Sequence, residues 1–181
     1  MGRAKGTTLI NAVKALRMKR NEALRLLPKH LHRYLEERIL VSSWYPEEDL
    51  LEILRTLAKL LPAAGTDVFE FMGRVSARSD LGGVYASLLR QGDPATTLRR
   101  TAVTWKHYHD TGKEEVIESS DGHAVIEISG FDSPSREICS TVKGWIYELV
   151  ELAGGKDIRV DHPQCVPEGA SSCRFKATWK R

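Results

Sequence analysis

The spacing of apolar residues changes at Gly112, and this change restricts the fold of the chain more than any other feature of the sequence. Before Gly112, apolar residues recur at helical intervals, most regularly over residues 50–61. After it, polar and apolar residues alternate over 115–118 and 123–128, on either side of Asp121-Gly122, a strong two-residue hairpin signal. Helical stripes followed by alternating segments predict an α+β fold.

The expected architecture is an N-terminal helical layer packed on a small antiparallel sheet of two hairpins, with a long helix between the hairpins. Thr7 or Thr8 is expected to cap the first helix, and Pro134 and Ser135 to start the last one. The expected helices cover about residues 8–16, 23–27, 31–40, 46–61, 67–75, 80–89, 94–109 and 134–153, and the expected strands cover 115–118, 123–128, 158–160 and 174–179.

The length of 181 residues suits one domain, 1–181, with a mainly helical part at 1–111 and a sheet plus helix at 112–181. The chain is 41% hydrophobic and 28% charged, which is typical of globular proteins and not of disordered ones. Its apolar runs fall short of the ~18–20 residues that span a bilayer, and no secretory signal is evident. We therefore expect a cytoplasmic protein without a membrane span.

The segment 3–33 is strongly basic, with nine Lys or Arg residues against the single acid Glu22. Such a block could contact nucleic acid, an anionic membrane or an acidic protein. It is more often a solvated helix face, and no aromatic residues interleave the basic ones as a base-stacking platform requires. We therefore expect no binding of nucleic acid.

All three cysteines and one histidine fall in the C-terminal third of the chain, as Cys139, His162, Cys165 and Cys173. His162 and Cys165 are separated by two residues, so both can face one ion, and a hairpin brings Cys173 close. Three thiolates and one imidazole form a closed tetrahedral zinc site of the structural kind. The spacing predicts such a site.

Other interpretations of the same residues stay open. Cys139 could be a plain core residue, and Cys165 and Cys173 could be free thiols or a hairpin disulfide. Asp161 and Glu168 are carboxylates that could replace one ligand, although His162 has the better spacing.

The stretch from Cys139 to Trp179 resembles the 4-vinyl-reductase-type ligand-binding domain. This domain belongs to a superfamily with the heme-NO-binding domains, the TRAPP trafficking subunits and the aromatic-effector sensors of bacterial regulators. The motif that carries the resemblance reads Cys139…Gly144-Trp145…Leu149…Leu152-Ala153-Gly154…Val160-x-His162-x2-Cys165…Gly169-x3-Cys173-x-Phe175. The whole chain resembles small stand-alone bacterial relatives of the heme-NO-binding group, with the landmarks 42–46 (SSWYP) and 80–85 (DLGGVY).

The resemblance implies zinc, because the aromatic-effector sensors hold it through three cysteines and one carboxylate at this spacing, with His162 at the carboxylate position. It does not extend to heme. The heme-NO-binding signature Tyr-x-Ser-x-Arg is absent, and no histidine lies on a strongly apolar helix. His107 and His109 are flanked by charged residues, so we expect both at the surface and heme to be unlikely.

We therefore expect a non-enzymatic sensory or interaction module for signalling. It would bind a small apolar molecule, a protein partner or both, and related folds suggest a homodimer. The alternatives are a protein scaffold without a ligand, and an enzyme acting on a tetrapyrrole or aromatic substrate. The aromatic residues considered as cavity lining are Trp44, Tyr45, Phe69, Phe71, Tyr85 and Trp105.

Overall fold

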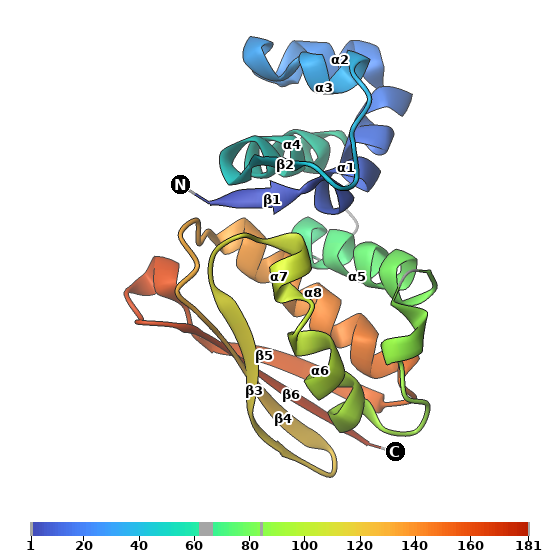
Figure 1. The fold of residues 1–181 in the computed structure, drawn as a ribbon, viewed down its shortest axis with the longest axis vertical. Coiled ribbons are helices and arrows are strands. Elements are labelled where there is room, and N and C mark those ends of the chain that lie inside the picture. Colours follow the sequence, from blue (N-terminus) through green and yellow to red (C-terminus); the bar gives the residue numbers. More distant parts are fainter. Residues whose placement is uncertain (1, 62–66, 84, 181) are drawn as a thin grey trace.

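The computed structural model describes residues 2–61, 67–83 and 85–180, which form two lobes, one above the other in Figure 1. The N lobe consists of β1 (Arg3–Lys5), α1 (Gly6–Met18), α2 (Arg20–Leu26), η1 (Lys29–Leu31), α3 (Arg33–Glu36), β2 (Trp44–Pro46) and α4 (Glu47–Leu60). The C lobe consists of α5 (Val68–Leu81), η2 (Ala86–Leu88), α6 (Pro94–Ala102), α7 (Trp105–Tyr108), β3 (Lys113–Ser120), β4 (His123–Ser129), α8 (Arg136–Leu152), β5 (Lys156–Gln164), η3 (Val166–Glu168) and β6 (Cys173–Lys180).

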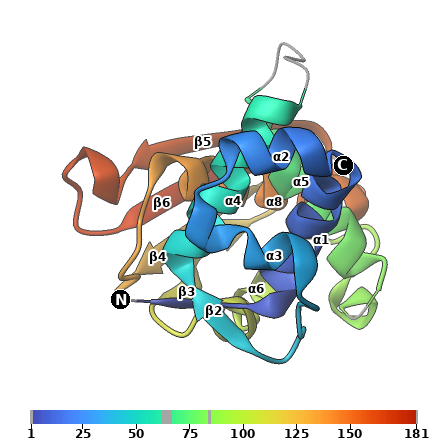
Figure 2. The same ribbon diagram turned by 90° about the horizontal axis from the view of Figure 1, so that it is seen from above.

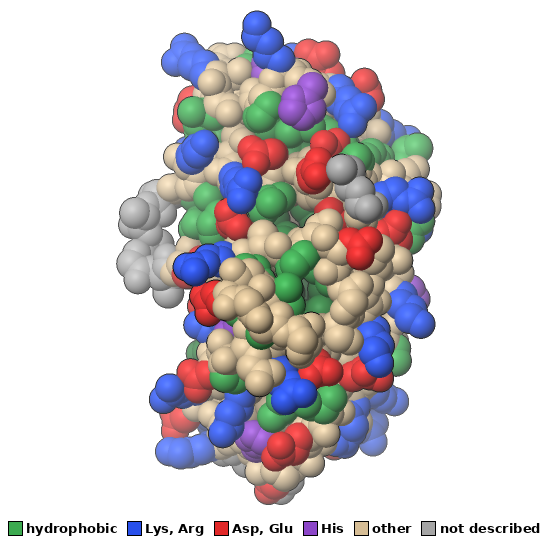
Figure 3. Space-filling model, turned by 90° about the vertical axis from the view of Figure 1, so that its left-hand side faces the viewer, with side chains coloured by type: hydrophobic (Ala, Val, Ile, Leu, Met, Phe, Trp, Pro, Cys, Tyr) green, Lys and Arg blue, Asp and Glu red, His purple; other side chains and the backbone are tan. Residues whose placement is uncertain are grey.

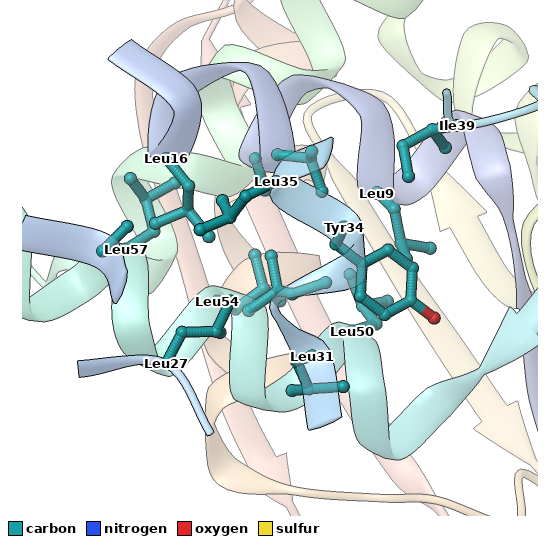
Figure 4. Close-up of a cluster of buried hydrophobic side chains, with 14 of the residues drawn as sticks. Leu9, Leu16, Leu27, Leu31, Tyr34, Leu35, Ile39, Leu50, Leu54 and Leu57 are labelled. Carbon is teal, nitrogen blue, oxygen red and sulfur yellow. The ribbon is translucent and has the colours of Figure 1, made fainter. Parts of the chain in front are cut away.

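The core of the N lobe is built from leucine-rich helix faces. Helix α4 begins with three acidic residues, which favour a helix N-terminus, and then buries one apolar stripe. Figure 4 shows Leu50, Leu54 and Leu57 of this stripe meeting Leu9 and Leu16 of α1. The stripe over 50–61 is therefore used inside the chain, and the predicted homodimer, if formed, requires another surface.

The C lobe contains the sheet predicted from the alternating segments. Its strands run in the order β3-β4-β6-β5, and every neighbouring pair is antiparallel. In β4 and β6 the residues alternate between buried and more exposed, because the helices cover one face of the sheet. Seen from above, α1, α2, α3 and α4 lie over the C lobe (Figure 2). The predicted mixed α+β fold is confirmed.

Helices α5 and α8 cross at unusually close range, which two glycines allow. A Cβ atom on Gly73 of α5 would lie 1.9 Å from the carbonyl oxygen of Thr141. A Cβ atom on Gly144 of α8 would lie 1.9 Å from the carbonyl oxygen of Glu70. The crossing therefore depends on residues without side chains.

Three features differ from the sequence-based expectations. The N-terminal residues Arg3–Lys5 form a strand paired with Trp44–Pro46, a pairing too short and too distant in sequence to give a periodic signal. Helix α1 begins at Gly6 without a capping side chain, so neither Thr7 nor Thr8 is its cap. In place of one helix over 80–89, α5 extends to Leu81 and the short helix η2 covers Ala86–Leu88; Val84 lies outside the described residues.

The helix expected over 94–109 is divided into α6 and α7. The hydroxyls of Thr101 and Thr104 donate hydrogen bonds to main-chain carbonyls one turn earlier, including Thr104 Oγ1 to Thr101 O at 2.7 Å. Such bonds bend helices. The bend carries Trp105 and His109 toward the N lobe, where His109 forms an isolated bridge with Ala4.

Several basic side chains of the segment 3–33 are engaged within the chain. Arg3 pairs with Asp110, Arg33 pairs with Asp49, and the Arg17 guanidinium donates to the carbonyl of Tyr34. These contacts are compatible with a solvated face, and the expected absence of nucleic-acid binding stays a prediction. Within the described residues, no helix has the length and apolar character needed to cross a membrane.

Candidate functional site

The four residues predicted as metal ligands come together at one end of the C lobe. Cys139 lies in the first turn of α8, His162 lies on β5, and Cys165 and Cys173 flank the loop between β5 and β6. The sulfur atoms and one ring nitrogen all lie within 4.8 Å of one another. The three cysteine side chains are buried, and all are free thiols.

The spacing of these atoms suits a single ion. A tetrahedral zinc ion ~2.3 Å from each sulfur would hold two sulfurs about 3.8 Å apart. The Sγ atoms of Cys139 and Cys173 lie 3.6 Å apart. The imidazole of His162 is fixed by stacking on Phe175, with the ring centroids 4.2 Å apart. Buried His162 Nε2 has no hydrogen-bond partner, so it is a donor atom that a metal ion would satisfy.

The protonation of the thiols also favours metal binding. The hydrogen bond from Cys139 lowers the pKa of Cys173 to about 4, and His162 contributes in the same direction. Burial raises the pKa of Cys165, and the hydrogen bond with Cys173 raises the pKa of Cys139. One sulfur is therefore readily present as the thiolate that zinc requires.

The two carboxylates considered as substitute ligands are engaged elsewhere. Asp161 pairs with Arg159 at 2.8 Å, and Glu168 lies 3.4 Å from Arg136. Neither belongs to the group of converging donor atoms. Of the alternatives in the sequence, His162 has the geometry of the fourth ligand.

A second candidate site is a cavity of about 120 Å³ between the two lobes, here called the inter-lobe cavity. Its N-lobe wall comes from α1 and α4, including Leu50 and Leu54, and its C-lobe wall from α5, α7, β3 and α8. Figure 3 shows a face of the molecule with hydrophobic side chains in a hollow at mid-height, where the lobes meet. Concave and largely apolar sites between structural units are typical of ligand binding.

His109 lies in the wall of this cavity and not at the surface, so the expectation for His109 was wrong. Its ring stacks on Trp105, with centroids 4.3 Å apart, and its Nδ1 lies 2.5 Å from Oε1 of Glu47. Glu47 is 2% exposed, and its second oxygen, Oε2, has no partner. The neighbours Lys106 and Asp110 are exposed, which is why the local sequence looked like a surface segment. His107 is exposed, as expected.

The opposite part of the cavity wall carries two carboxyl groups. Asp80 accepts a hydrogen bond of 2.9 Å from the hydroxyl of Tyr108, and burial raises the pKa of Asp80. Glu114, on β3, has no hydrogen bond or ion pair with any described residue, and burial raises its pKa to about 8. Among the described residues, no Lys or Arg lines the cavity.

Glu114 gives a pH-dependent prediction. Because its folded pKa of about 8 exceeds the usual value near 4.5, its contribution penalises the folded state as pH rises from about 4.5 to 8. Glu114→Gln removes this penalty. The variant is expected to have a higher melting temperature than wild type at pH 8.5 and nearly the same one at pH 5. The gain in free energy of unfolding is a few kcal/mol at most, since one pKa unit corresponds to about 1.4 kcal/mol.

The control for this measurement is Glu115→Gln, an exposed carboxyl on the same strand. It should show no such growth of the difference with pH. An equal difference between Glu114→Gln and wild type at both pH values would contradict the raised pKa of Glu114.

Of the six aromatic residues considered as cavity lining, only Trp105 lines the inter-lobe cavity. Phe71 is 49% exposed, Trp44 lies beneath the Lys5 ammonium, and Tyr85 stacks on exposed His107. Tyr45 and Phe69 pack against the N-lobe core instead. Sequence reasoning missed Glu114, because a register shift between Val116 and Glu118 places it opposite Ile128 on the inward face of the β3–β4 hairpin.

Comparison with known proteins identifies the fold. No protein-family model matches the chain, and no curated protein sequence matches it. Among solved structures, a triple mutant of an H-NOX protein from S. oneidensis in the Fe(II) ligation state is 18% identical, with 98% of this chain and 96% of that chain covered and a TM-score of 0.69. An oxygen-binding H-NOX domain related to soluble guanylate cyclases is 14% identical, with 98% and 95% covered and a TM-score of 0.67.

These likenesses show that the chain has the H-NOX fold. The heme-NO-binding part of the predicted resemblance is confirmed at that level, and the 4-vinyl-reductase part is not. The expectation that heme is unlikely is contradicted, because the structural neighbours include an Fe(II)NO complex and a protein studied for heme distortion. That expectation relied on the absence of the Tyr-x-Ser-x-Arg signature and on the charged neighbours of the histidines, and those neighbours gave no sign that His109 lines the cavity.

The residues present offer one fitting contact for a heme. The Nδ1 atom of His109 is hydrogen-bonded to the carboxylate of Glu47, an arrangement typical of histidines that hold metals. The cavity of about 120 Å³ is smaller than the ~300–1,000 Å³ of typical ligand pockets, and no cation in its wall faces the carboxylates of a porphyrin among the described residues.

Proposed function

We propose that this chain is a non-enzymatic sensory module whose ligand binds in the inter-lobe cavity and whose signal passes to a protein partner. The observation that carries the proposal is the hydrogen bond between His109 and Glu47. His109 belongs to the C lobe and lines the cavity, and Glu47 is the first residue of α4 in the N lobe. A ligand that contacts His109 therefore acts on a bond that joins the two lobes.

A second set of contacts joins the two lobes next to this hydrogen bond. Asp110 accepts from the backbone nitrogen and the Nε of Arg3 at 2.6 and 2.7 Å, and its own backbone nitrogen donates to the carbonyl of Arg3. Strand β1 is in turn paired with β2, which leads directly into α4. A displacement at His109 would thus reach the N-terminal strand, whose exposed residue Arg3 a partner could contact.

For a heme ligand, His109 is the residue that would hold the iron, with Glu47 hydrogen-bonded to its Nδ1 and orienting the ring. The iron would then supply a binding position for a diatomic gas. Trp105, stacked on His109, would hold the imidazole plane in place.

The cysteine cluster completes the proposal as a structural zinc site formed by Cys139, His162, Cys165 and Cys173. It is supported by the convergence of four donor atoms and by the unpartnered Nε2 of His162. An ion there would fasten α8 to the β5–β6 hairpin. Helix α8 also supplies part of the cavity wall, through Ile138 and Val142.

Cavity filling tests the ligand-binding proposal. Ser76 lines the cavity on α5, so Ser76→Phe is expected to abolish binding of a small neutral probe such as cyclopentanol, measured by calorimetry. The control, Val75→Phe, changes an exposed residue of the same helix that does not line the cavity and should bind like wild type. Equal binding by wild type and Ser76→Phe would contradict the proposal.

Hemin is the probe for the heme-based form of this function. A Soret band with one hemin per chain, lost in His109→Ala and kept in His107→Ala, is expected if His109 is the axial ligand. A band that survives in His109→Ala would exclude that residue as the ligand.

An enzyme is the second candidate, because Asp80 and Glu114 are titratable groups with raised pKa values that converge on the cavity. Turnover separates the two functions. A tetrapyrrole recovered chemically unchanged from the protein after prolonged incubation supports the sensor, and a changed mass supports the enzyme.

A further inference from the structure

The inter-lobe cavity has an uneven distribution of charge that bears on its ligand. Two carboxyl groups, Asp80 and Glu114, lie in its wall, and among the described residues no Lys or Arg accompanies them. Asp80 already accepts from the Tyr108 hydroxyl at 2.9 Å and is also hydrogen-bonded to the Trp145 side chain. Glu114 has no described partner at all. A carboxyl group in such surroundings is costly unless something pairs with it.

Glu114 does not lie on the outward face of the β3–β4 hairpin, where surface acids are found. In the β3–β4 hairpin, Glu114 is opposite Ile128 and Val116 is opposite Ile126, and both isoleucines are buried. Residues directly opposite in a hairpin share one face of the sheet. Glu114 therefore occupies an inward position of the strand, and its exposed neighbour Glu115 occupies the outward one.

The remaining wall provides surfaces that also favour a cation. Trp105, Tyr108 and Trp145 all line the cavity. The faces of aromatic rings attract ammonium groups, more strongly where water is excluded. Buried Thr7 Oγ1, an atom of another lining residue, has no hydrogen-bond partner and could accept from a ligand N–H.

The size of the cavity limits the ligand. An engineered cavity of about 150 Å³ accepts benzene. The inter-lobe cavity, at about 120 Å³, therefore suits an apolar group of roughly five or six heavy atoms, with any longer part outside.

We propose that the ligand of the inter-lobe cavity is a small organic cation, an amine whose apolar body fills the cavity and whose ammonium group pairs with Glu114 and Asp80. This inference rests on the proposed ligand-binding function and names the chemical class of the ligand. Trp105, Tyr108 and Trp145 surround the cationic end, and Glu114 supplies the carboxylate that has no other partner.

Three probes of similar shape and different charge test the proposal at pH 8: cyclopentylamine, cyclopentanol and cyclopentanecarboxylate. Wild type is expected to bind the amine at least tenfold more tightly than the alcohol, and the carboxylate most weakly. Glu114→Gln is expected to lower amine affinity about tenfold while leaving the affinity for the alcohol unchanged. The matched control, Glu115→Gln, should bind all three probes like wild type.

The outcomes separate the two proposals. The proposed cationic ligand is wrong if the amine binds wild type no better than the alcohol, or if Glu114→Gln binds the amine like wild type. Binding of the alcohol would still support the proposal that the cavity binds a ligand. Stoichiometric hemin binding that excludes the amine has the same consequence. If no probe binds wild type, the proposal of a cationic ligand is wrong, and the proposal that the cavity binds a ligand is no longer supported. Glu114→Gln removes a partly exposed acid without a described partner, so it should remain folded, which its melting curve verifies.

Discussion

Removal of the proposed zinc ion with a chelator is expected to lower the melting temperature of this protein by roughly 10–20 °C. Binding of a structural zinc ion in small peptides is worth ~10–16 kcal/mol, because the site forms only in the folded chain. Here each lobe has its own apolar core, so we expect a smaller share, about 5 kcal/mol. For a chain of this size, 1 kcal/mol corresponds to about 2–4 °C.

Cys173→Ser should reproduce this loss, because Cys173 lies 3.6 Å from Cys139 and has the sulfur most readily present as thiolate. His162→Ala should retain weaker binding, with water in the vacant position. Ser171→Ala, an exposed change two residues from Cys173, serves as the control. The metal proposal fails if protein purified without chelator holds well under one zinc per chain and a chelator leaves its melting temperature unchanged.

Gly144→Ala is expected to destabilise the protein by about 3 kcal/mol or more and to weaken ligand binding. Its Cβ atom would lie 1.9 Å from the carbonyl oxygen of Glu70, so α5 and α8 would have to move apart. These two helices also carry cavity residues, among them Ser76 and Trp145. A wider crossing would therefore alter the cavity as well as the core.

The control is Val75→Ala, a truncation of an exposed residue of α5. Chemical denaturation should show a shift of less than about 0.5 kcal/mol for this control. If Gly144→Ala unfolds at the same denaturant concentration as wild type, the close approach of α5 and α8 does not contribute to the stability of the protein as expected.

Local patterns in the sequence were sufficient for the parts of the fold that depend on neighbouring residues. The Asp121-Gly122 turn places Gly122 at φ 77°, as a tight hairpin requires, and Ser135 caps α8 by accepting from the amide of Ile138. The helical stripe over 50–61 became α4 with the expected face buried. These features follow from residues within a few positions of one another.

The cavity could not be read in the same way, because it depends on contacts between distant segments. His109 reaches it through the bend between α6 and α7 and through pairing with β1, which has only three residues. Its partner Glu47 looked like an ordinary acidic residue at a helix N-terminus, yet it is 2% exposed. The cysteine cluster differs, since three rare residues and one histidine at suitable spacing allowed a specific prediction before the chain was folded.

The most direct measurement of the central proposal uses the indole N–H resonances of the four tryptophans in a nitrogen-15 NMR titration with cyclopentanol. Trp105 and Trp145 line the inter-lobe cavity, and Trp44 and Trp179 do not, so the chain carries its own controls. We expect saturable shifts at Trp105 and Trp145, absent in Ser76→Phe, with Trp44 and Trp179 unchanged. Shifts confined to Trp44 and Trp179, or no saturable shift at all, would contradict a ligand-binding cavity between the lobes.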